Sequence, residues 1–405
     1  MKPVRVAHLV SHPIQYFAPL YRELAARPDV DLTVYFYSDA TARAFRDDGF
    51  GRTIAWDTPL LDGYRSRILP SASRTDISGR FLKTPNIDIV REIAARRYDA
   101  IWGHGYAHLT TWLAAAAARA SGAELLVRDE QTLLHGRPAP KRALKAVALR
   151  ALYAQSSGLY IGEQSRRYFR RYGMPEERLF PARYCVDNRY WRGQARDLAP
   201  QRAALRARFG VAGDAPVVLF SGKLIEKKQP LMLIEAFARL RARHDCALLI
   251  AGDGPLRPEA EALAARLGLA DVRFAGFLNQ SELPMAYAAA DVFVLPSKLH
   301  ETWGLVVNEA MNFGLPVVLS DKVGCAEDLV PGDRNGFTFG HRSVTQLASA
   351  LEALVADEAL RRRLGEQGRA HIERYSIEAC ADGIVAACLA RTGRAAAPGD
   401  AALAA

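Results

Sequence analysis

The strongest constraint on the fold is an alternation of short apolar segments with helical stretches, which runs through the chain twice. The first run places five buried strands, at residues 4–10, 31–37, 99–104, 123–129 and 158–162. Polar, turn-rich residues follow from about 187 to 216, and the alternation then restarts with "PVVLFSG". Apolar strands separated by helices are typical of a parallel sheet covered on both faces. The sequence therefore predicts an α/β protein with two doubly wound, Rossmann-like domains, followed by C-terminal helices.

Composition narrows the class of protein. Half of the 405 residues are hydrophobic, yet the longest apolar run, 109–118, is far shorter than the roughly 18 residues that span a bilayer. The chain begins with "MKPVRVAHLV", which lacks the build of a signal peptide, so a cytoplasmic protein is expected. The five cysteines are scattered and contain no C-x-x-C pair. Neither a disulfide framework nor a zinc site is therefore predicted.

The charge indicates an anionic partner. The net charge is +10, and the segment from Arg128 to Arg183 carries an excess of seven positive charges. Nucleic acid, an anionic membrane or a phosphorylated small molecule could each match such a charge. No nucleic-acid-binding motif accompanies it, so nucleic acid is not expected. Within the segment, "KRALKAVALRALY" is interpreted either as a solvated helix face or as a membrane-surface helix.

Two carboxylates flank a loop and a helix in the second block. Glu301 lies in the loop after the strand "DVFVLPS", and Glu309 lies in a helix predicted from about Gly304 to Phe313. Ligands of open parallel sheets bind at the carboxyl ends of the strands, where this loop begins. The free N–H groups of the first helical turn are a natural site for phosphate. A nucleotide sugar, with hydroxyl groups at each end and phosphates between them, would fit this arrangement.

Lysines follow the first strand of the second block. The stretch "FSGKLIEKKQP" places Lys223, Lys227 and Lys228 at another carboxyl end. Most lysines are solvated surface residues, so this stretch alone is weak evidence. Together with the helix terminus, the lysines could balance the charge of a diphosphate leaving group.

These segments carry a family resemblance. The order "GK…K", "AGDGP", "FAGFL", "DVFVLPS", the Glu301-x7-Glu309 pair and "NGF" resembles the donor domain of glycosyltransferase family 4, whose members are retaining enzymes of the GT-B fold. The resemblance covers roughly residues 215–340, and "YGMPEERLFPARYCVDN" extends it backward. The E-x7-E frame is specific, whereas "GDG" alone also occurs in dinucleotide-binding enzymes.

The resemblance implies a role for each matching residue. Lys223 and Lys228 would hold the diphosphate, Glu301 the hydroxyls of the transferred sugar, and Glu309 the hydroxyls of the ribose. His104 would face the donor sugar, although an ordinary strand-end histidine is the competing interpretation. Glu301, His104 and Lys228 form the expected catalytic set. The remaining donor-binding residues implied are Gly222, Gly252, Phe277, Leu278, Trp303, Gly304 and Leu305, with Phe277 and Leu278 reading the base.

Two departures from the family pattern matter. Lys223 stands where the family usually has Arg. The replacement removes the planar guanidinium that can grip a phosphate at two points. The Gly-Gly loop that often follows the first strand is replaced by "SHPIQYFAPLYREL". The candidate acceptor contacts are therefore His12, Gln15, Tyr16, Arg128 and Glu130.

The GT-B resemblance also implies a division of the chain. Residues 1–190 would form the acceptor-binding domain and residues 191–372 the donor-binding domain, facing each other across a central cleft. A helix at 373–391 would return to the first domain. The tail 392–405, rich in Ala, Gly and Pro, is expected to be disordered.

The expected reaction moves a hexose-type sugar from a UDP- or GDP-linked donor to a hydroxyl acceptor with retention. No cofactor is required, and no suitable Asp-x-Asp indicates a metal. The expected acceptor is a lipid-linked or polysaccharide precursor, as in lipopolysaccharide or exopolysaccharide synthesis, reached by peripheral association with the inner face of the membrane. Alternatives are a soluble acceptor, a nucleotide-sugar 2-epimerase of GT-B fold and a non-catalytic sugar-binding protein. A dehydrogenase is disfavoured because no G-x-G-x-x-G turn follows a predicted strand.

Overall fold

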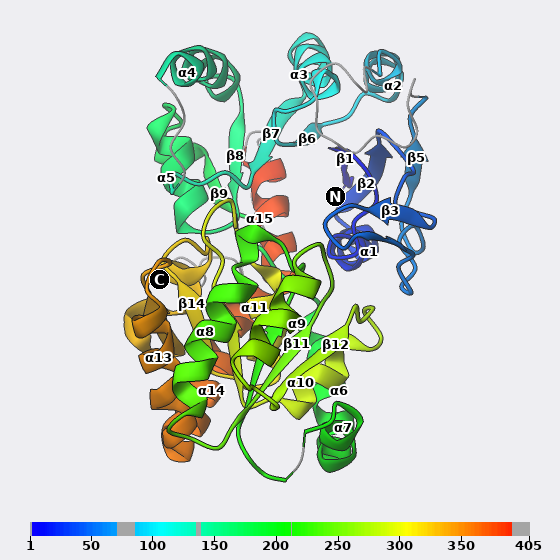
Figure 1. The fold of residues 1–405 in the computed structure, drawn as a ribbon. Coiled ribbons are helices and arrows are strands. Elements are labelled where there is room, and N and C mark those ends of the chain that lie inside the picture. Colours follow the sequence, from blue (N-terminus) through cyan, green and yellow to red (C-terminus); the bar gives the residue numbers. More distant parts are fainter. Residues whose placement is uncertain (1, 71–85, 135–138, 212, 391–405) are drawn as a thin grey trace. The chain divides into compact units, whose positions relative to one another are not determined.

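The computed structural model describes residues 2–70, 86–134, 139–211 and 213–390. It divides the chain into two compact units. Unit 1 holds the chain up to Phe45, Thr58–Tyr184 and the chain from Ser376 onward. Unit 2 holds Arg46–Asp57 and Cys185–Tyr375. Each unit is built around its own parallel sheet with flanking helices, visible in Figure 1.

Unit 1 contains a seven-stranded parallel sheet. Its strand order is β5-β2-β1-β6-β7-β8-β9. The strands are β1 (Val4–Val10), β2 (Val30–Phe36), β5 (Ser66–Ile68), β6 (Ala100–His104), β7 (Glu124–Asp129), β8 (Ser157–Tyr160) and β9 (Leu179–Pro181). The helices are α1 (Ala18–Ala26), α2 (Asp88–Arg96), α3 (Leu109–Ser121), α4 (Ala139–Tyr153), α5 (Glu163–Arg171) and α15 (Ile377–Leu389), with a 3-10 turn η1 (Glu176–Arg178). The strand order reverses between β1 and β6, which makes their carboxyl ends the place for a ligand.

Unit 2 contains a six-stranded parallel sheet. Its strand order is β12-β11-β10-β13-β14-β15. The strands are β10 (Val217–Ser221), β11 (Ala247–Ala251), β12 (Val272–Gly276), β13 (Val292–Leu295), β14 (Val317–Ser320) and β15 (Gly336–Phe339). The order reverses between β10 and β13, so the loops after these two strands are neighbours at the carboxyl edge. A separate two-stranded hairpin, β3 (Phe45–Asp47) with β4 (Arg52–Ile54), contributes its residues from Arg46 onward to this unit.

Helices surround the unit 2 sheet, and local sequence signals mark where some of them begin. They are α6 (Asn188–Leu198), α7 (Arg202–Arg208), α8 (Pro230–Arg241), α9 (Arg257–Arg266), α10 (Leu283–Ala289), α11 (Leu305–Asn312), α12 (Ala326–Leu329), α13 (Val344–Ala356) and α14 (Glu358–His371). Short 3-10 turns are η2 (Ala199–Gln201), η3 (Glu226–Lys228), η4 (Pro331–Asp333) and η5 (Ile372–Tyr375). Ser343 and Asp357 cap α13 and α14, each accepting a backbone N–H of the first turn. Every residue of β10 and β11 is buried, as expected for strands covered on both faces.

The predicted fold class is confirmed, since both units are doubly wound parallel α/β structures. The division of the chain differs in detail from the predicted boundaries. Residues 46–57 belong to unit 2, although they lie within the predicted first domain of 1–190. Unit 1 resumes at Ser376, and its helix α15 is held to α1 by the ion pair between Arg27 and Asp382, 2.6 Å. The predicted tail 392–405 lies outside the described residues. Within the described chain, no helix combines the length and apolarity needed to cross a membrane.

Candidate active site

Glu301 lies at the carboxyl edge of the unit 2 sheet, in the loop after β13. Its carboxylate Oε2 is 2.5 Å from Lys228 Nζ and 3.6 Å from Lys227 Nζ. Ser297 Oγ donates a hydrogen bond to the same oxygen at 3.0 Å. Burial, with the residue only 8% exposed, would raise the pKa of Glu301, but Lys228, Lys227 and Ser297 outweigh it and lower the pKa. The carboxylate is therefore ionised at neutral pH and anchored to the two lysines.

The lysines come from the loop after β10, on the other side of the topological switch. Burial lowers the pKa of Lys227, and the nearby charges of Lys228 and Lys223 add to this effect while Glu301 opposes it. Gln229 closes the loop in a left-handed conformation, φ 53°. Its side-chain amide donates to Pro296 O at 2.6 Å, which ties the loop after β10 to the one after β13. The fold thus gathers cationic groups and one carboxylate at a single edge.

Glycines let the neighbouring loops approach. Gly252 has φ 159°, and a Cβ there would lie 1.9 Å from the carbonyl oxygen of Gly222. The loops after β10 and β11 therefore run in direct backbone contact. Gly304 stands at the N-cap of α11 with φ 103°, a conformation that a side chain disfavours. Leu305 opens the helix, no side chain caps it, and the N–H of Val307 donates to the carbonyl of Gly304 at 2.9 Å. The N–H groups of Leu305 and Val306 are therefore the ones that an anion at this position could bind.

Glu309 is fully buried within unit 2. Its Oε2 accepts a hydrogen bond of 2.7 Å from the hydroxyl of Tyr287, a residue of α10 that is also fully buried. Trp303 is 2% exposed and donates through Nε1 to Asn308 Oδ1 at 2.9 Å. Both Trp303 and Glu309 are covered by the protein in this structure, so either side chain would have to be uncovered to contact a ligand. Phe277 and Leu278 follow β12 and are half-buried, in the loop that the prediction assigns to the base.

Lys223 has a partner that sequence reasoning missed. Its Nζ lies 2.9 Å from both carboxylate oxygens of Asp47, a residue of the β3–β4 hairpin. The only sequence signal is the turn "RDDGFG", because Asp followed two residues later by Gly is common in turns. Ser297 was also missed, although it holds Glu301 directly.

In unit 1, His104 ends β6 at the second switch point. Its Nε2 lies 3.2 Å from Glu130 Oε1, which follows β7. Burial would raise the pKa of Glu130, but His104 and Arg128 outweigh it and lower the pKa. His12 lies after β1, where its Nδ1 pairs with Ser11 Oγ at 2.9 Å. Burial, with the charges of His104 and His108, lowers the pKa of His12 to about 4, so its ring is neutral at pH 7.

The other predicted acceptor contacts divide into two groups. Gln15 and Tyr16 are half-buried in the turn before α1 and remain accessible. Arg128 is instead fully buried, and its guanidinium lies over the rings of Phe17 and Tyr184 at 5.4 and 5.1 Å. This burial argues against direct contact between Arg128 and an acceptor. Arg128 instead influences the site by lowering the pKa of Glu130, which favours the ionised form of that carboxyl group.

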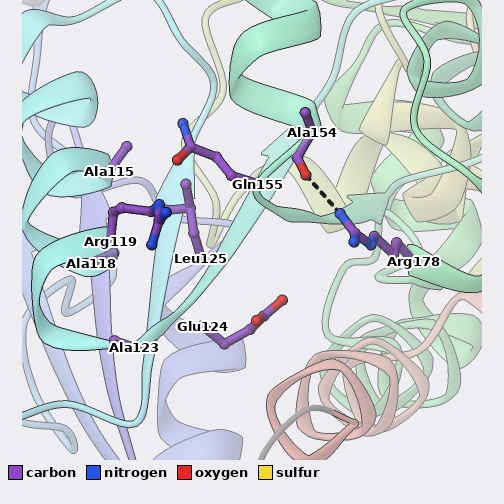
Figure 2. A pocket seen from close by; sticks show the side chains of 10 residues that line it. Ala115, Ala118, Arg119, Ala123, Glu124, Leu125, Ala154, Gln155 and Arg178 are labelled. Carbon is purple, nitrogen blue, oxygen red and sulfur yellow. Dashed lines mark hydrogen bonds between the residues drawn. The ribbon is translucent and has the colours of Figure 1, made fainter.

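A separate pocket in unit 1 lies away from the switch point of that unit's sheet. Figure 2 shows it between α3, the start of β7 and the end of α4. Its volume is about 370 Å³. Arg119, Glu124 and Arg178 line it, and Arg178 donates to the carbonyl of Ala154 at 2.8 Å. Glu124 is the first residue of β7, so this pocket is at the amino edge of the sheet. Ligands of doubly wound sheets bind at the carboxyl edge, so this pocket lies at the opposite edge from the expected ligand site.

Two family matches cover most of the chain. Residues 13–184 match the family described as "Glycosyl transferase 4-like domain", and residues 201–371 match "Glycosyl transferases group 1". The chain belongs to glycosyltransferase family 4, of the GT-B fold. The family matches divide at about residues 184–201, close to the passage from unit 1 to unit 2 after Tyr184, although residues 46–57 of the first match belong to unit 2.

Curated relatives of this glycosyltransferase carry varied names. It is 32% identical over 228 residues to the alpha-D-kanosaminyltransferase of Streptomyces kanamyceticus, covering 55% of this chain and 58% of that protein. It is 35% identical over 176 residues to a GDP-mannose-dependent alpha-(1-6)-phosphatidylinositol monomannoside mannosyltransferase of Mycolicibacterium smegmatis, covering 42% of this chain and 46% of that protein. The chain thus spans about half the length of these curated relatives.

A solved structure shows the same fold. The Anabaena protein HepE, in complex with UDP and glucose, has a TM-score of 0.70 with this chain at 18% identity. The likeness covers 94% of this chain and 98% of HepE. At this level of identity, the comparison concerns the fold alone.

Proposed function

We propose that the protein transfers a hexose-type sugar from a nucleoside diphosphate sugar, linked to UDP or GDP, to a hydroxyl acceptor with retention of configuration. The observation that carries the proposal is the cluster of Lys227, Lys228 and Glu301 beside the N-terminus of α11, at the switch point of unit 2. Two cations and free backbone N–H groups suit a diphosphate, while an ionised carboxylate suits sugar hydroxyls.

The chemistry of transfer follows from where charge develops. The bond between the anomeric carbon and the phosphate oxygen breaks, and a bond from the acceptor oxygen forms on the same face. The leaving diphosphate gains negative charge, so Lys228 and the α11 N–H groups act mainly on the transition state. The acceptor's proton passes to the leaving phosphate oxygen, which balances the reaction. Glu301 orients the sugar, and its pair with Lys228 holds the carboxylate in place.

A ligand screen followed by an activity assay tests the donor assignment. UDP and GDP should raise the thermal midpoint of the protein, because a ligand that binds only the folded state stabilises it by RT ln(1 + [L]/Kd). Lys228→Ala should abolish the shift. Arg243→Ala is a matched control. Arg243 is exposed, lies between α8 and β11 near the opposite edge of the sheet, and pairs with Glu352 of α13. Anomeric NMR of the product would report retention, and interconversion of the nucleotide sugar without acceptor would instead favour an epimerase.

We infer that the acceptor is lipid-linked or a glycolipid precursor presented at an anionic membrane. On α4, Leu144 and Val147 are 76% and 69% exposed and lie three residues apart, with exposed Arg150 on the following turn. Exposed apolar side chains beside a cation are typical of a helix that lies in a membrane interface. The relative from Mycolicibacterium smegmatis is named for a phosphatidylinositol mannoside, which supports the same class of acceptor.

The basic segment "KRALKAVALRALY" suggested that Lys145 would face a membrane together with the other cations of α4. The structure places its side chain elsewhere. Its ammonium lies 5.1 Å from the ring of Tyr106, 4.8 Å from Tyr168 and 5.9 Å from Tyr172. Cation–π contacts of this kind hold the lysine against the protein. The side chains of Lys141 and Arg142 lie outside the described residues.

Vesicle sedimentation tests the membrane proposal. The protein should bind anionic vesicles in low salt but not neutral ones, and binding should fall when Leu144 and Val147 are replaced by Gln. Ile87→Gln is the matched control, because Ile87 is also 69% exposed in unit 1 but precedes α2. Equal, negligible binding to both kinds of vesicle would contradict the proposal and leave a soluble acceptor.

A further inference from the structure

The β3–β4 hairpin contacts the loops of unit 2 that the proposed function assigns to the donor. The chain leaves unit 1 after Phe45, forms the hairpin and returns to unit 1 at Thr58. Its strands are only three residues each, and most of their side chains are exposed or half-buried. Side-chain contacts to unit 2, rather than a core of its own, therefore hold the hairpin in place.

Asp47 is the most strongly held residue of the hairpin. Its Oδ1 accepts backbone N–H bonds from Gly49 at 2.9 Å and Phe50 at 3.1 Å. Both carboxylate oxygens also accept from Lys223 Nζ at 2.9 Å. Gly49 lets the lysine pass, because a Cβ there would lie 2.6 Å from Lys223 Cδ. The turn therefore presents a preorganised carboxylate to one lysine.

The rest of the hairpin is anchored at the loop after β12. The ring of Phe50 meets Phe277 edge-on, with centroids 4.9 Å apart, and the guanidinium of Arg52 lies 5.3 Å from the centre of the same ring. The side chain of Asn279 donates to the carbonyl of Ala55 at 2.7 Å. Lys223 Nζ also lies 5.0 Å from the centre of the Phe50 ring. The contacts with Phe277 and the hydrogen bond from Asn279 are made without the lysine, so the hairpin can remain docked when Asp47 and Lys223 separate.

We infer that Asp47 and the diphosphate of the donor compete for Lys223, which makes the hairpin a regulating part of the donor site. The inference rests on the proposed function, in which Lys223 holds the diphosphate. A carboxylate 2.9 Å from the ammonium neutralises the lysine and repels a second anion at the same place. Lys is suited to such an exchange, because its ammonium is a compact point charge on a flexible stem that can move between partners.

The consequence is an adjustable affinity. A diphosphate carries more negative charge than one carboxylate and also binds Lys228 and the α11 N–H groups, so it displaces Asp47 from Lys223. The binding free energy is reduced by the cost of breaking the Asp47–Lys223 pair. After transfer, Asp47 returns to Lys223 and assists release of the nucleoside diphosphate.

Isothermal titration with UDP and GDP, using the full chain, tests the inference. Asp47→Asn removes the charge and keeps an oxygen for the turn, so it should tighten binding about two- to five-fold, the range expected for a partly exposed ion pair. Asp48→Asn is the matched control, because Asp48 is the next residue, is 95% exposed and pairs with Arg46 rather than with Lys223. It should leave the affinity unchanged. In a Lys223→Ala background, Asp47→Asn should also have no effect, since the competition acts through Lys223.

The outcomes separate the inference from the proposed function. Nucleotide binding by the wild type with equal or weaker binding by Asp47→Asn would overturn the inference and leave the donor site intact. Tighter binding that persists in the Lys223→Ala background would also overturn it. If folded wild type, Asp47→Asn and Asp48→Asn all fail to bind UDP or GDP, the donor assignment itself is wrong and the inference falls with it.

Discussion

Lys228→Ala tests the ion pair at the centre of the candidate site. The change removes the partner 2.5 Å from Glu301 and leaves a carboxylate that is only 8% exposed. Breaking a buried pair on one side costs about 3–5 kcal/mol. Lys227 at 3.6 Å and the hydrogen bond from Ser297 remain, so we expect the lower end of that range. For a unit of this size, about 3 kcal/mol lowers the thermal midpoint by about 6–12 °C.

The pH dependence identifies the carboxylate as the cause. The pKa of Glu301 is lowered in the folded protein, so its ionised form contributes stability above its unfolded pKa of about 4.3, and this contribution is lost as the pH falls through the folded pKa. Without Lys228, burial has less opposition and the pKa of Glu301 rises. The cost of Lys228→Ala should therefore be full at pH 7 and shrink as the pH falls toward 4.

A double-mutant cycle by thermal or urea unfolding completes the assay. Glu301→Gln in the Lys228→Ala background should recover most of the lost stability, because no buried charge remains unpaired. Arg243→Ala, in an exposed pair, should change the free energy of unfolding by less than about 1 kcal/mol. Costs of the two single changes that add within about 0.5 kcal/mol would refute the reasoning, since residues in contact should couple.

Three further outcomes are expected. Glu309→Ala should weaken binding of a plain nucleoside diphosphate in titration calorimetry, whereas Glu301→Ala should cut turnover and leave that affinity nearly unchanged; equal effects on affinity would contradict the assignment. Lys223→Arg should preserve or raise kcat/KM, and a large loss would show that a planar fork does not fit there. Burial raises the pKa of Asp129 to about 6, so the stability that it contributes in its protonated form is lost as the pH rises from its unfolded pKa of about 3.9 to about 6; Asp129→Asn should remove this loss, its effect on the thermal midpoint should be more favourable at pH 8 than at pH 4, and the opposite trend would exclude this cause.

The fold could be predicted because its signal is local and repeated. Strands buried on both faces read as apolar runs, and β10 and β11 are buried at every residue. The meeting of Lys228 with Glu301 could also be anticipated, since both follow strand ends and parallel strands align their carboxyl ends at one edge. The sequence could not supply the order of the strands, in which β10 and β13 are neighbours although β11 and β12 lie between them in the chain.

The side-chain surroundings of several residues could not be predicted in the same way. Arg128 sits at the carboxyl end of β7, where a charged residue is expected to reach a ligand, yet it is fully buried beside Phe17 and Tyr184. Its neighbours come from the residue before α1 and from the chain after β9, far apart in sequence. Lys145 likewise looks like a solvated helix residue until three tyrosines are placed around it. Tertiary contacts decide both cases, and no local periodicity reports them.

The hairpin shows why a motif can locate a site and still misjudge its charge. Every residue that the family resemblance assigns to the diphosphate lies between 215 and 340, and that stretch alone predicts a cationic Lys223. The carboxylate that neutralises this lysine is 176 residues earlier in the chain, in a three-residue strand with no hydrophobic pattern. The affinity of the donor site therefore depends on a segment outside the motif. If only motif residues were changed, an effect that depends on both Lys223 and Asp47 would be assigned to Lys223 alone. Changing both residues, singly and together, separates their contributions.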